Sequence, residues 1–510
     1  MGEPTGEGRE PGGRGAGESR GGYRGRLKSL LADPHLRETL DRFARDYPAS
    51  REAAFAGTDR DRAIEELAAA RDAAAARLGE LAELFRREAS RRGARVYLAA
   101  DARECREIVA GIAREIGAGR IVKSKSMTCE EIGLNARLAA DGIAVSETDL
   151  GEWLVQLRGE APSHMVLPAI HLSRYQADET IAAATGRGAG GDVPALVRLA
   201  RAALRPDFAG AGMSVTGANL AIASSGTLGI VSNEGNVGLC AALPGTHVAV
   251  VGIDKLVPDL KDALRILSVL PRNATGQRMT AYLSLVSGAP SGAGAPSHGE
   301  GGSPAAPSGR RDLRVVLLDN GRSRMAADPG VRQILRCVRC GACANVCPVY
   351  RMVGGHGLGG VYQGPAGLVL TFLLEGPAAA RNIAWNCLGC GACREVCAAA
   401  IELPRLIEEI RARLHERDGF RPEQGLLAAV LSRRRLMGLA LRAAAAFQGP
   451  AVRDGMVRHL PFVLSGDAGF RSLPALADRP FRALWKGILR EGADSPAGRG
   501  VGKGGRDPEG

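Results

Sequence analysis

Aromatic residues and lysines are both scarce in this chain of 510 residues. Aromatics make up 4% of the sequence, and only seven of the 67 basic residues are lysine, the rest being scattered arginines. Surfaces that bind nucleic acid combine a basic stripe with aromatic side chains that stack on bases. No such stretch is present, so the formal net charge of +12 does not indicate a nucleic-acid partner.

Long uncharged apolar runs are also missing. The first thirty residues are rich in Gly, Arg and Glu and contain no apolar segment typical of a signal peptide, so we expect a cytoplasmic protein. The most apolar candidate, residues 431–447, is interrupted by arginines at 433–435 and by Arg442. It is too charged to span a bilayer. We interpret it as an amphipathic helix that packs on its own domain or makes weak contact with a membrane surface.

The order of apolar patterns predicts an open α/β sheet. From residue 95 to 149 strand-like segments alternate with helix-like ones, and β-rich text continues up to RVVLLD at 314–319. Such alternation is typical of parallel sheets. We also expect one long helix from Arg60 to Gly93, a strand at MVLPAI (165–170) and a hairpin-like segment at 218–236.

Composition predicts where the domains begin and end. The two ends of the chain are rich in Gly and Arg. A Gly/Pro/Ser segment interrupts the part of the sequence that is rich in strand-like segments, and no strand-like segment follows residue 320. The predicted parts are a disordered tail (1–26), an α/β domain with N-terminal helices (27–319) containing a flexible insertion (287–309), a helical domain with the cysteine runs (320–421), a C-terminal helical region (422–492) and a second disordered tail (493–510).

Eight of the eleven cysteines lie in two runs, CVRCGACANVCP at 337–348 and CLGCGACREVCA at 387–398. Each run has the C-x2-C-x2-C-x3-C spacing of two-cluster ferredoxins, in which the fourth cysteine binds the other cluster. Zinc sites usually separate two C-x2-C pairs by a longer loop, and disulfides are rare in reducing compartments. The spacing predicts two [4Fe-4S] clusters, the first held by Cys337, Cys340, Cys343 and Cys397 and the second by Cys347, Cys387, Cys390 and Cys393.

Other signals near these runs carry less information. The second run ends in Ala398 where the first has a proline, which leaves the number of ligands unchanged. Two G-x-G-x-x-G matches, at 186–191 and 355–360, do not follow strands, so we interpret them as loops without a nucleotide. The remaining cysteines stand alone and are expected to be small buried residues; they are Cys105, Cys129 and Cys240.

Polar residues at the ends of predicted strands form a candidate substrate site. Lys123 and Lys125 follow a strand, at the edge where open α/β sheets bind ligands, and lysines there suit a carboxylate or phosphate. The same residues can equally be solvated strand ends, with His164 and His171 as hydrogen-bonded structural residues. The catalytic candidates are Lys123, Lys125 and Glu234, and the substrate-binding candidates are Lys123, Lys125, Asn135, Asn219, Thr227 and Asn236.

Several blocks of the sequence, in their order, resemble a known family. The blocks are VKSKSMTCEEIGLNARLAADGIAVSETDLGEWLVQLRGEAPSHMVLPAIH, GMSVTGANLAIASSGTLGIVSNEGN, LPGTHVAVVGIDKLVP, LDNGRSRMAADP and both cysteine runs. Over residues 27–490 the chain is similar to lactate utilization protein B, the iron–sulfur subunit family of a bacterial L-lactate utilization system. The resemblance implies a LUD-type sheet domain similar to the ribose-isomerase and CoA-transferase superfold, followed by an all-α ferredoxin-like two-cluster domain.

The resemblance also implies partners and an activity. The partners are a cysteine-rich subunit and a subunit that carries a LUD domain alone, and the activity is oxidation of L-lactate, or another small 2-hydroxy acid, to its 2-oxo acid. By analogy with CoA transferases, Glu234 lies in a loop of the kind that bears a catalytic glutamate. Three functions stay open: an electron-transfer subunit, a self-contained 2-hydroxy-acid dehydrogenase, and a docking subunit whose sheet domain is not catalytic.

Overall fold

The computed structural model describes residues 19–288, 312–419, 422–457 and 473–477, together with 481, 484 and 485. The chain forms two compact units, Met1–Leu414 and His415–Gly510. The predicted tail 493–510 and almost all of the predicted insertion 287–309 lie outside the described residues, as does most of the tail 1–26. Helix α1 (Arg20–Ala32) begins inside that predicted tail.

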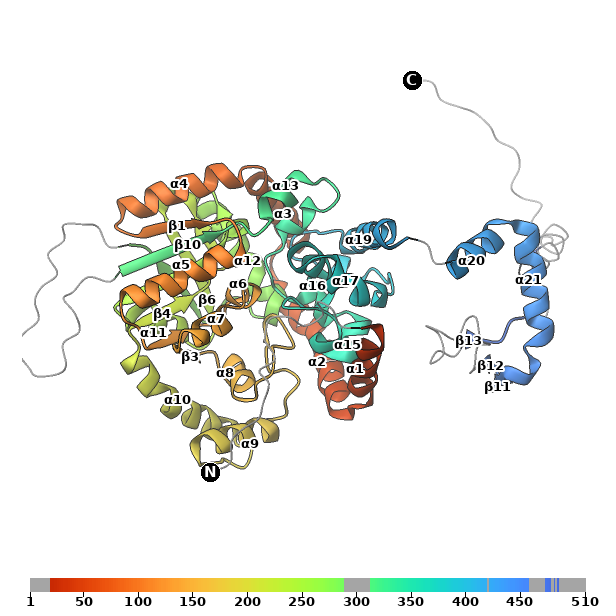
Figure 1. The fold of residues 1–510 in the computed structure, drawn as a ribbon, viewed down its shortest axis with the longest axis horizontal. Helices are drawn as coiled ribbons and strands as arrows, with labels where there is room; N and C mark the ends of the chain where they lie inside the picture. Colours follow the sequence, from red (N-terminus) through yellow and green to blue (C-terminus); the bar gives the residue numbers. More distant parts are fainter. Residues whose placement is uncertain are drawn as a thin grey trace, which may run out of the picture. The chain divides into compact units, whose positions relative to one another are not determined.

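A six-stranded parallel sheet forms the centre of the first unit, with the order β1-β10-β7-β4-β2-β3 (Figure 1). The prediction of a parallel α/β sheet is therefore confirmed. Strand β10 comes last along the chain among the six strands of this sheet. It pairs with β1 on one side and with β7 on the other, so the chain returns to the interior of the sheet. The strands are β1 (Arg95–Ala99), β2 (Arg120–Lys123), β3 (Ala144–Glu147), β4 (Met213–Thr216), β7 (Thr246–Gly252) and β10 (Asp312–Leu318).

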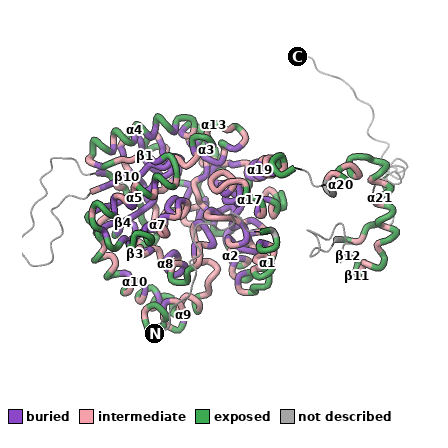
Figure 2. Tube along the Cα trace, viewed as in Figure 1, coloured by how far each residue is buried: buried purple, intermediate pink, exposed green. Residues whose placement is uncertain are grey.

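The neighbouring strands β7 and β10 carry apolar side chains on both faces because both faces of the sheet are covered. Val248 and Val316 belong to a core shared with α5 (Ala102–Glu115), whereas Ala249 and Val315 belong to a core on the opposite face. Successive side chains of a strand point to opposite faces, which explains the alternation. Figure 2 shows the buried residues concentrated in the strands and the inner faces of the helices.

A second sheet, of order β8-β5-β6-β9, packs on that opposite face. Its strands β5 (Leu220–Ile222) and β6 (Thr227–Ser232) are antiparallel, as the hairpin-like sequence predicted. The turn between them needs Gly226: its φ is 60°, and an added Cβ would lie 2.4 Å from Cα of Ala89. The other two strands are β8 (Leu256–Val257) and β9 (Tyr282–Val286).

Two predicted elements differ from the structure. The long helix expected from Arg60 is two helices, α3 (Arg60–Ala75) and α4 (Leu78–Arg91), preceded by α2 (Pro34–Phe55). The strand expected at residues 165–170 was wrong, because this segment consists of turns. Two of its backbone amides donate to the ring of His164 instead of to a neighbouring strand.

Helices of different lengths connect the strands of the first sheet and cover its edges. They position the polar residues that follow β2, β3 and β6. In order along the chain they are α6 (Met127–Glu131), α7 (Leu134–Ala140), α8 (Leu150–Leu157), α9 (Arg174–Thr185), α10 (Val193–Gly210), α11 (Asn236–Ala242) and α12 (Leu260–Thr275).

The cysteine segment is helical and belongs to the same compact unit as the sheets. Helix α2 packs on α14 and α15, and α3 packs on the 3-10 helix Arg332–Arg336. The N-terminal helices therefore join the sheet to the cysteine segment. Its helices are α13 (Arg322–Ala327), α14 (Ala342–Asn345), α15 (Pro348–Gly357), α16 (Gly364–Leu370), α17 (Pro377–Ile383), α18 (Ala392–Glu395) and α19 (Leu403–Asp418).

The second unit contains α20 (Pro422–Ser432), α21 (Arg434–Phe447) and a small sheet of β11 (Val452–Arg453), β12 (Met456–Val457) and β13 (Leu473–Pro474). The sequence predicted only helices here. Helix α21, the predicted amphipathic segment, has no buried residue. Among the described residues, no helix combines the length and apolar character that crossing a membrane requires.

Candidate functional site

The two cysteine runs fold in the same way. Each starts after a 3-10 helix, passes through a left-handed glycine, and carries its third cysteine on a single helical turn. The glycines are Gly341, with φ of 77°, and Gly391, with φ of 84°, a conformation that costs a glycine little. The two turns, α14 and α18, pack against each other. The repeat in the sequence is thus a repeat in space.

The first three cysteines of run one lie near the fourth cysteine of run two. Burial places the pKa of Cys343 well above the usual thiol value, and the charges of Cys337, Cys340 and Cys397 raise it further. Burial likewise raises the pKa of Cys397 to about 12, with further contributions from Cys340 and Cys337. These four residues, here called the first thiol group, therefore lie close enough together for their charges to interact.

The remaining four run cysteines form the second thiol group: Cys347, Cys387, Cys390 and Cys393. Burial raises the pKa of Cys347 to about 11, and the charges of Cys387 and Cys390 add to it. Cys393, with a pKa raised to about 12 chiefly by burial, senses Cys387, Cys347 and Cys390. Each group thus contains three cysteines of one run and the fourth of the other.

Each group has the four thiols that a [4Fe-4S] cluster requires. Backbone amides already point at the sulfur atoms: Ile401 N lies 3.3 Å from Cys397 Sγ, and Gly389 N lies 3.4 Å from Cys387 Sγ. Within the described ranges no three His, Cys, Asp or Glu side chains converge as they would on a single metal ion. The donor set and its amides suit a cluster in which each thiolate binds a different iron atom.

Asn273, at the end of α12, links the sheet part of the unit to the first thiol group. Its Nδ2 donates to Val396 O at 2.7 Å and lies 3.7 Å from Cys340 Sγ. Its Oδ1 accepts from Arg51 Nε at 2.7 Å, and its carbonyl accepts from the Tyr47 hydroxyl at 2.6 Å. Asn273 is completely buried. Sequence reasoning missed it because nothing local marks an asparagine at a helix end as a contact of a distant cysteine.

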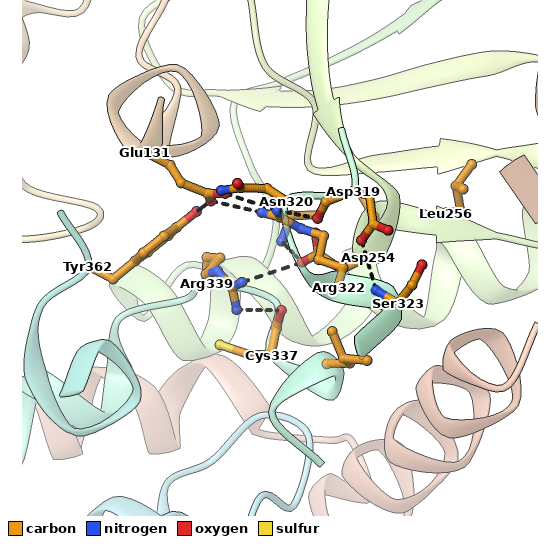
Figure 3. Close-up of polar contacts among 12 residues, drawn as sticks. Glu131, Asp254, Leu256, Asp319, Asn320, Arg322, Ser323, Cys337, Arg339 and Tyr362 are labelled. Atoms are coloured by element: carbon orange, nitrogen blue, oxygen red, sulfur yellow. Dashed lines mark hydrogen bonds and ion pairs between the residues drawn. The ribbon is translucent and has the colours of Figure 1, made fainter. Parts of the chain in front are cut away.

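A buried network of charged side chains lies beside Cys337 (Figure 3). Arg322 makes a two-pronged pair with Glu131, at 2.8 and 2.9 Å, and its Nε donates to Asp254. Arg339 extends from Asp254 to the carbonyl oxygen of Cys337, with 3.4 Å for each contact. The charged side chains of this network are at most 10% exposed: Glu131, Asp254, Arg322 and Arg339.

Further groups complete the network. Lys255 Nζ lies 3.2 Å from Asp254 Oδ2, and Arg71 donates to Leu335 O at 2.8 Å and to the carbonyl of Asp254. The Tyr362 hydroxyl donates to Glu131 at 2.7 Å, and the Arg339 guanidinium lies 4.9 Å from the centre of the Tyr362 ring. Four cations thus face two carboxylates beside Cys337. Members of this network lie in four of the blocks that carry the resemblance, but nothing in those blocks predicted that they meet. These members are Glu131, Asp254, Lys255, Arg322 and Arg339.

Lys123 lies in a closed ion-pair network at the carboxyl end of β2. Its Nζ is 2.7 Å from Glu147 Oε1 and 3.0 Å from Glu130 Oε1. Asn135, another candidate, donates to the same Glu147 oxygen at 2.7 Å. Lys123 is completely buried, and the two carboxylates raise its pKa against the effect of burial. Lys123 and Asn135 therefore share Glu147 as a partner, and Lys123 already has two carboxylate partners.

Lys125 and Glu234, by contrast, belong to a looser group. Lys125 Nζ lies 4.0 Å from Glu152 Oε1, and neither atom has a hydrogen-bond partner. Burial lowers the pKa of Lys125, which also senses Asp149 and Glu234. Glu234 accepts a hydrogen bond from Leu150 N at 3.0 Å, at the start of α8. Glu152 was not among the predicted site residues.

The other predicted candidates are engaged in local structure. Asn219 accepts from Val231 N at 2.8 Å within the hairpin, and Thr227 accepts from the Ser225 hydroxyl at 2.9 Å. Asn236 donates to Thr148 Oγ1 at 3.2 Å, beside the group around Lys123. In the part of the chain that the structure describes, neither Asn219 nor Thr227 forms a hydrogen bond with Lys125. The three lone cysteines, Cys105, Cys129 and Cys240, are buried as expected.

The two histidines have different surroundings. His164 is buried, and its Nδ1 accepts from Val166 N and Leu167 N, so its Nε2 carries the proton and donates to Asn345 Oδ1 at 2.9 Å. Burial lowers its pKa to about 4, so the ring is neutral. His171 contacts Ser163 and Glu160 at 2.7 and 2.8 Å. His164 thus reaches α14 of the first cysteine run, and the His171 ring packs edge-on against His356 of α15, with ring centres 4.9 Å apart.

The comparisons with known proteins match these two parts of the chain. The LUD domain family matches residues 82–296, and the 4Fe-4S dicluster domain family matches residues 333–401. A solved structure of a duf162 family protein from Deinococcus radiodurans is 16% identical, covers 47% of this chain and 98% of that one, and has a TM-score of 0.25, too low to support an argument. The chain therefore carries a LUD domain and an iron–sulfur dicluster domain.

Three curated relatives span most of the chain. Lactate utilization protein B of Oceanobacillus iheyensis is 36% identical over 403 residues, covering 78% of this chain and 82% of that protein. The protein of the same name from Geobacillus thermodenitrificans is 36% identical over 412 residues, covering 80% and 84%. An uncharacterized electron transport protein of Escherichia coli, YkgF, is 35% identical over 390 residues, covering 76% and 78%. The chain belongs to the lactate utilization protein B family.

Proposed function

We propose that this chain is the iron–sulfur electron-transfer subunit of a system that oxidises L-lactate to pyruvate. The observation that carries the proposal is the crossed arrangement of the cysteines, in which the fourth cysteine of each run lies beside the first three of the other. This arrangement supports one [4Fe-4S] cluster held by Cys337, Cys340, Cys343 and Cys397 and a second held by Cys347, Cys387, Cys390 and Cys393.

A [4Fe-4S] cluster, when bound, takes up and releases one electron at a time, at a potential set by its surroundings. The chain supplies those surroundings. Backbone amides of Ala342, Ala366 and Ile401 donate toward thiol sulfur atoms and stabilise negative charge there. The buried cations beside Cys337 act in the same direction. The helical turns α14 and α18 hold the two groups next to each other.

The two thiol groups have different neighbours, which suggests a direction of electron flow. The first group contacts the sheet part of the unit through Asn273, and its glycine Gly341 lies against His164. The second group includes Cys390, which is exposed. Electrons enter on the side of the sheet and leave from the side of Cys390 toward an acceptor.

The family resemblance supplies the finer parts of the proposal. The sheet domain is similar to the ribose-isomerase and CoA-transferase superfold, and the cysteine segment is similar to all-α ferredoxin domains. A cysteine-rich subunit and a LUD-only subunit are the partners, and the assembly works in the cytoplasm. Because oxidation of lactate releases two electrons, a chain that holds two one-electron carriers suits the reaction.

The test is to purify the chain without oxygen and to measure iron, sulfide and low-temperature EPR spectra, alone and with co-expressed partner subunits, before and after L-lactate is added. We expect about eight iron atoms per chain, the content of two [4Fe-4S] clusters. Cys390→Ser should remove about half of the iron, while Cys105→Ala, outside both groups, should leave it unchanged. Full iron content in Cys390→Ser would contradict the ligand assignment. Failure of lactate to reduce the clusters with every partner present would contradict the function.

A further inference from the structure

Two lysines leave the same strand edge in different states. Lys123 has two carboxylate partners, at 2.7 and 3.0 Å, whereas the Nζ of Lys125 is buried without a hydrogen-bond partner. The ion pair of Lys125 with Glu152 is 4.0 Å long, too long for a hydrogen bond, and Glu152 Oε1 is also unpartnered. A buried polar group without a partner is costly, so such groups at a strand edge indicate a ligand.

The carboxyl groups of Glu152 and Glu234 have different pKa values. Burial raises the pKa of Glu152 to about 8, and Lys125 opposes that increase. Partial desolvation of its carboxyl group and the charge of Asp149 raise the pKa of Glu234 to about 7, while the Leu150 amide and Lys125 lower it. At pH values between these two, Glu152 has a proton to donate and Glu234 has a carboxylate to accept. The charged groups that face Lys125 and these two acids are Lys123, Glu130, Glu147 and Asp149, with neutral His164 beside them.

The group also lies next to the first thiol group. The charge of Lys125 reaches His164 and lowers its pKa. The His164 ring in turn touches the first cysteine run, since a Cβ added to Gly341 would lie 2.7 Å from His164 Cε1. His164 is therefore a neighbour both of the charge of Lys125 and of Gly341 in the first run. Glu234 is exposed in this group, while Glu152 is 5% exposed, so the group is open to solvent at one end and closed at the other.

We propose that Lys125, Glu152 and Glu234 bind a small 2-hydroxy acid, whose carboxylate accepts from Lys125 and from protonated Glu152 and whose hydroxyl donates to the Glu234 carboxylate. The ligand gives Lys125 the counter-charge and Glu152 the acceptor that they lack. The identity of the acid rests on the proposed function. The inference adds that this chain, and not only a partner subunit, holds the acid next to the first thiol group.

The test is equilibrium dialysis of labelled L-lactate against the full chain, purified without oxygen and reduced with dithionite so that the acid cannot be oxidised. Propionate, which lacks only the hydroxyl, is the matched ligand. We expect saturable binding of L-lactate and at least tenfold weaker binding of propionate. Lys125→Met should weaken L-lactate binding at least tenfold, whereas Lys261→Met, on the exposed start of α12, should change it less than twofold. No saturable binding, or equal binding by Lys125→Met and the unchanged chain, would overturn the proposal.

The dependence of affinity on pH provides a second test that does not need Lys125→Met to fold. Affinity should be highest between pH about 7 and about 8, and it should fall up to tenfold per pH unit outside this window, because each required proton change is a single ionisation. Glu152→Gln keeps a hydrogen-bond donor without the ionisation, so it should flatten the alkaline fall. Glu234→Gln should flatten the acid fall. Profiles that are unchanged in both variants would overturn the assignment.

These outcomes separate the binding site from the proposed function. If the chain contains two clusters and relays electrons but binds no L-lactate, the binding proposal fails and the electron-transfer proposal stands. If L-lactate binds but EPR shows no reducible cluster, the electron-transfer proposal fails and the binding site stands.

Discussion

The two thiol groups come from runs of the same spacing and each has two buried cysteines, yet only the second group has an exposed one. In the first group Cys337 and Cys343 are 8% and 7% exposed, and a network of buried charges adjoins Cys337. In the second group Cys390 is exposed, and the neighbouring Leu388 is 65% exposed. The cysteine spacing determines which thiols meet. The helices and sheets that pack around the thiols determine how exposed each thiol is to solvent and how many charged side chains lie near it.

This difference bears on the potentials of the two clusters that we propose. Charge, hydrogen bonds to sulfur and solvent exposure are what set such potentials. A cation in a buried site acts through a low effective dielectric and is screened little, whereas a cation at the surface is screened by water and salt. The first site should therefore respond strongly to changes of nearby charge and the second weakly. The predictions below test this contrast.

Loss of a cysteine should have the largest effect, and it should differ between the groups. Cys343→Ser and Cys390→Ser should each remove about half of the iron, because each removes one of four ligands. Only Cys343→Ser should also lower the thermal midpoint strongly, since its cluster binds inside the packed unit and its binding energy contributes to folding. Iron analysis and thermal unfolding of both variants check this. Equal midpoints in the two variants would show that the burial difference has no energetic consequence.

Removal of the central carboxylate of the charge network should have the next largest effect. Asp254→Asn leaves Arg322, Arg339 and Lys255 without their shared partner in a fully buried place. Breaking a buried pair in this way typically costs about 3–5 kcal/mol of unfolding free energy. Urea unfolding of the anaerobic protein measures it. As a control, Asp141→Asn breaks partly exposed pairs with Arg137 and Arg114, and it should change stability much less. A similar small change in both variants would contradict the structural role of the network.

The sequence predicted the sheet, but not the groups that surround the cysteines, and the assignment of the cysteines to two clusters stays a prediction. Strand alternation and cysteine spacing are local patterns that can be recognised without the fold. Residues 165–170 were mistaken for a strand because they are all apolar, whereas the His164 ring accepts hydrogen bonds from two of their amides and holds them in a turn. The pairing of Arg339 with Asp254 joins residues 85 positions apart, and Asn273 meets Val396 over 123 positions. No local pattern encodes such pairs, so they could only be found in the fold.

Neutralising one cation at each group should produce a moderate and unequal shift in potential. Arg339 is 10% exposed and contacts Cys337 O, while Arg394, beside Cys393 in the second run, is 64% exposed. Arg339→Met should lower the midpoint potential of the first cluster, because a lost cation destabilises the more negative reduced form. Arg394→Met should shift the second cluster less, because water screens that charge. Redox titration followed by EPR resolves both. A larger shift in Arg394→Met would reverse the comparison.

The smallest effect should come from a single hydrogen bond to sulfur. Asn273 Nδ2 lies 3.7 Å from Cys340 Sγ, and Asn273→Leu removes that donor while keeping a side chain of similar size in a fully buried place. Its loss should lower the potential of the first cluster by less than Arg339→Met does, because an amide dipole carries no net charge and the sulfur keeps its backbone donor from Ala342. The same variant also leaves Arg51 Nε without its acceptor, so a modest loss of stability should accompany the shift. Among the described residues, Asn273 Nδ2 donates only to Val396 O and Cys340 Sγ, so EPR titration should find the second cluster unchanged. A shift of both clusters by the same amount would mean that the residue acts through the packing of α14 on α18 and not through its hydrogen bond.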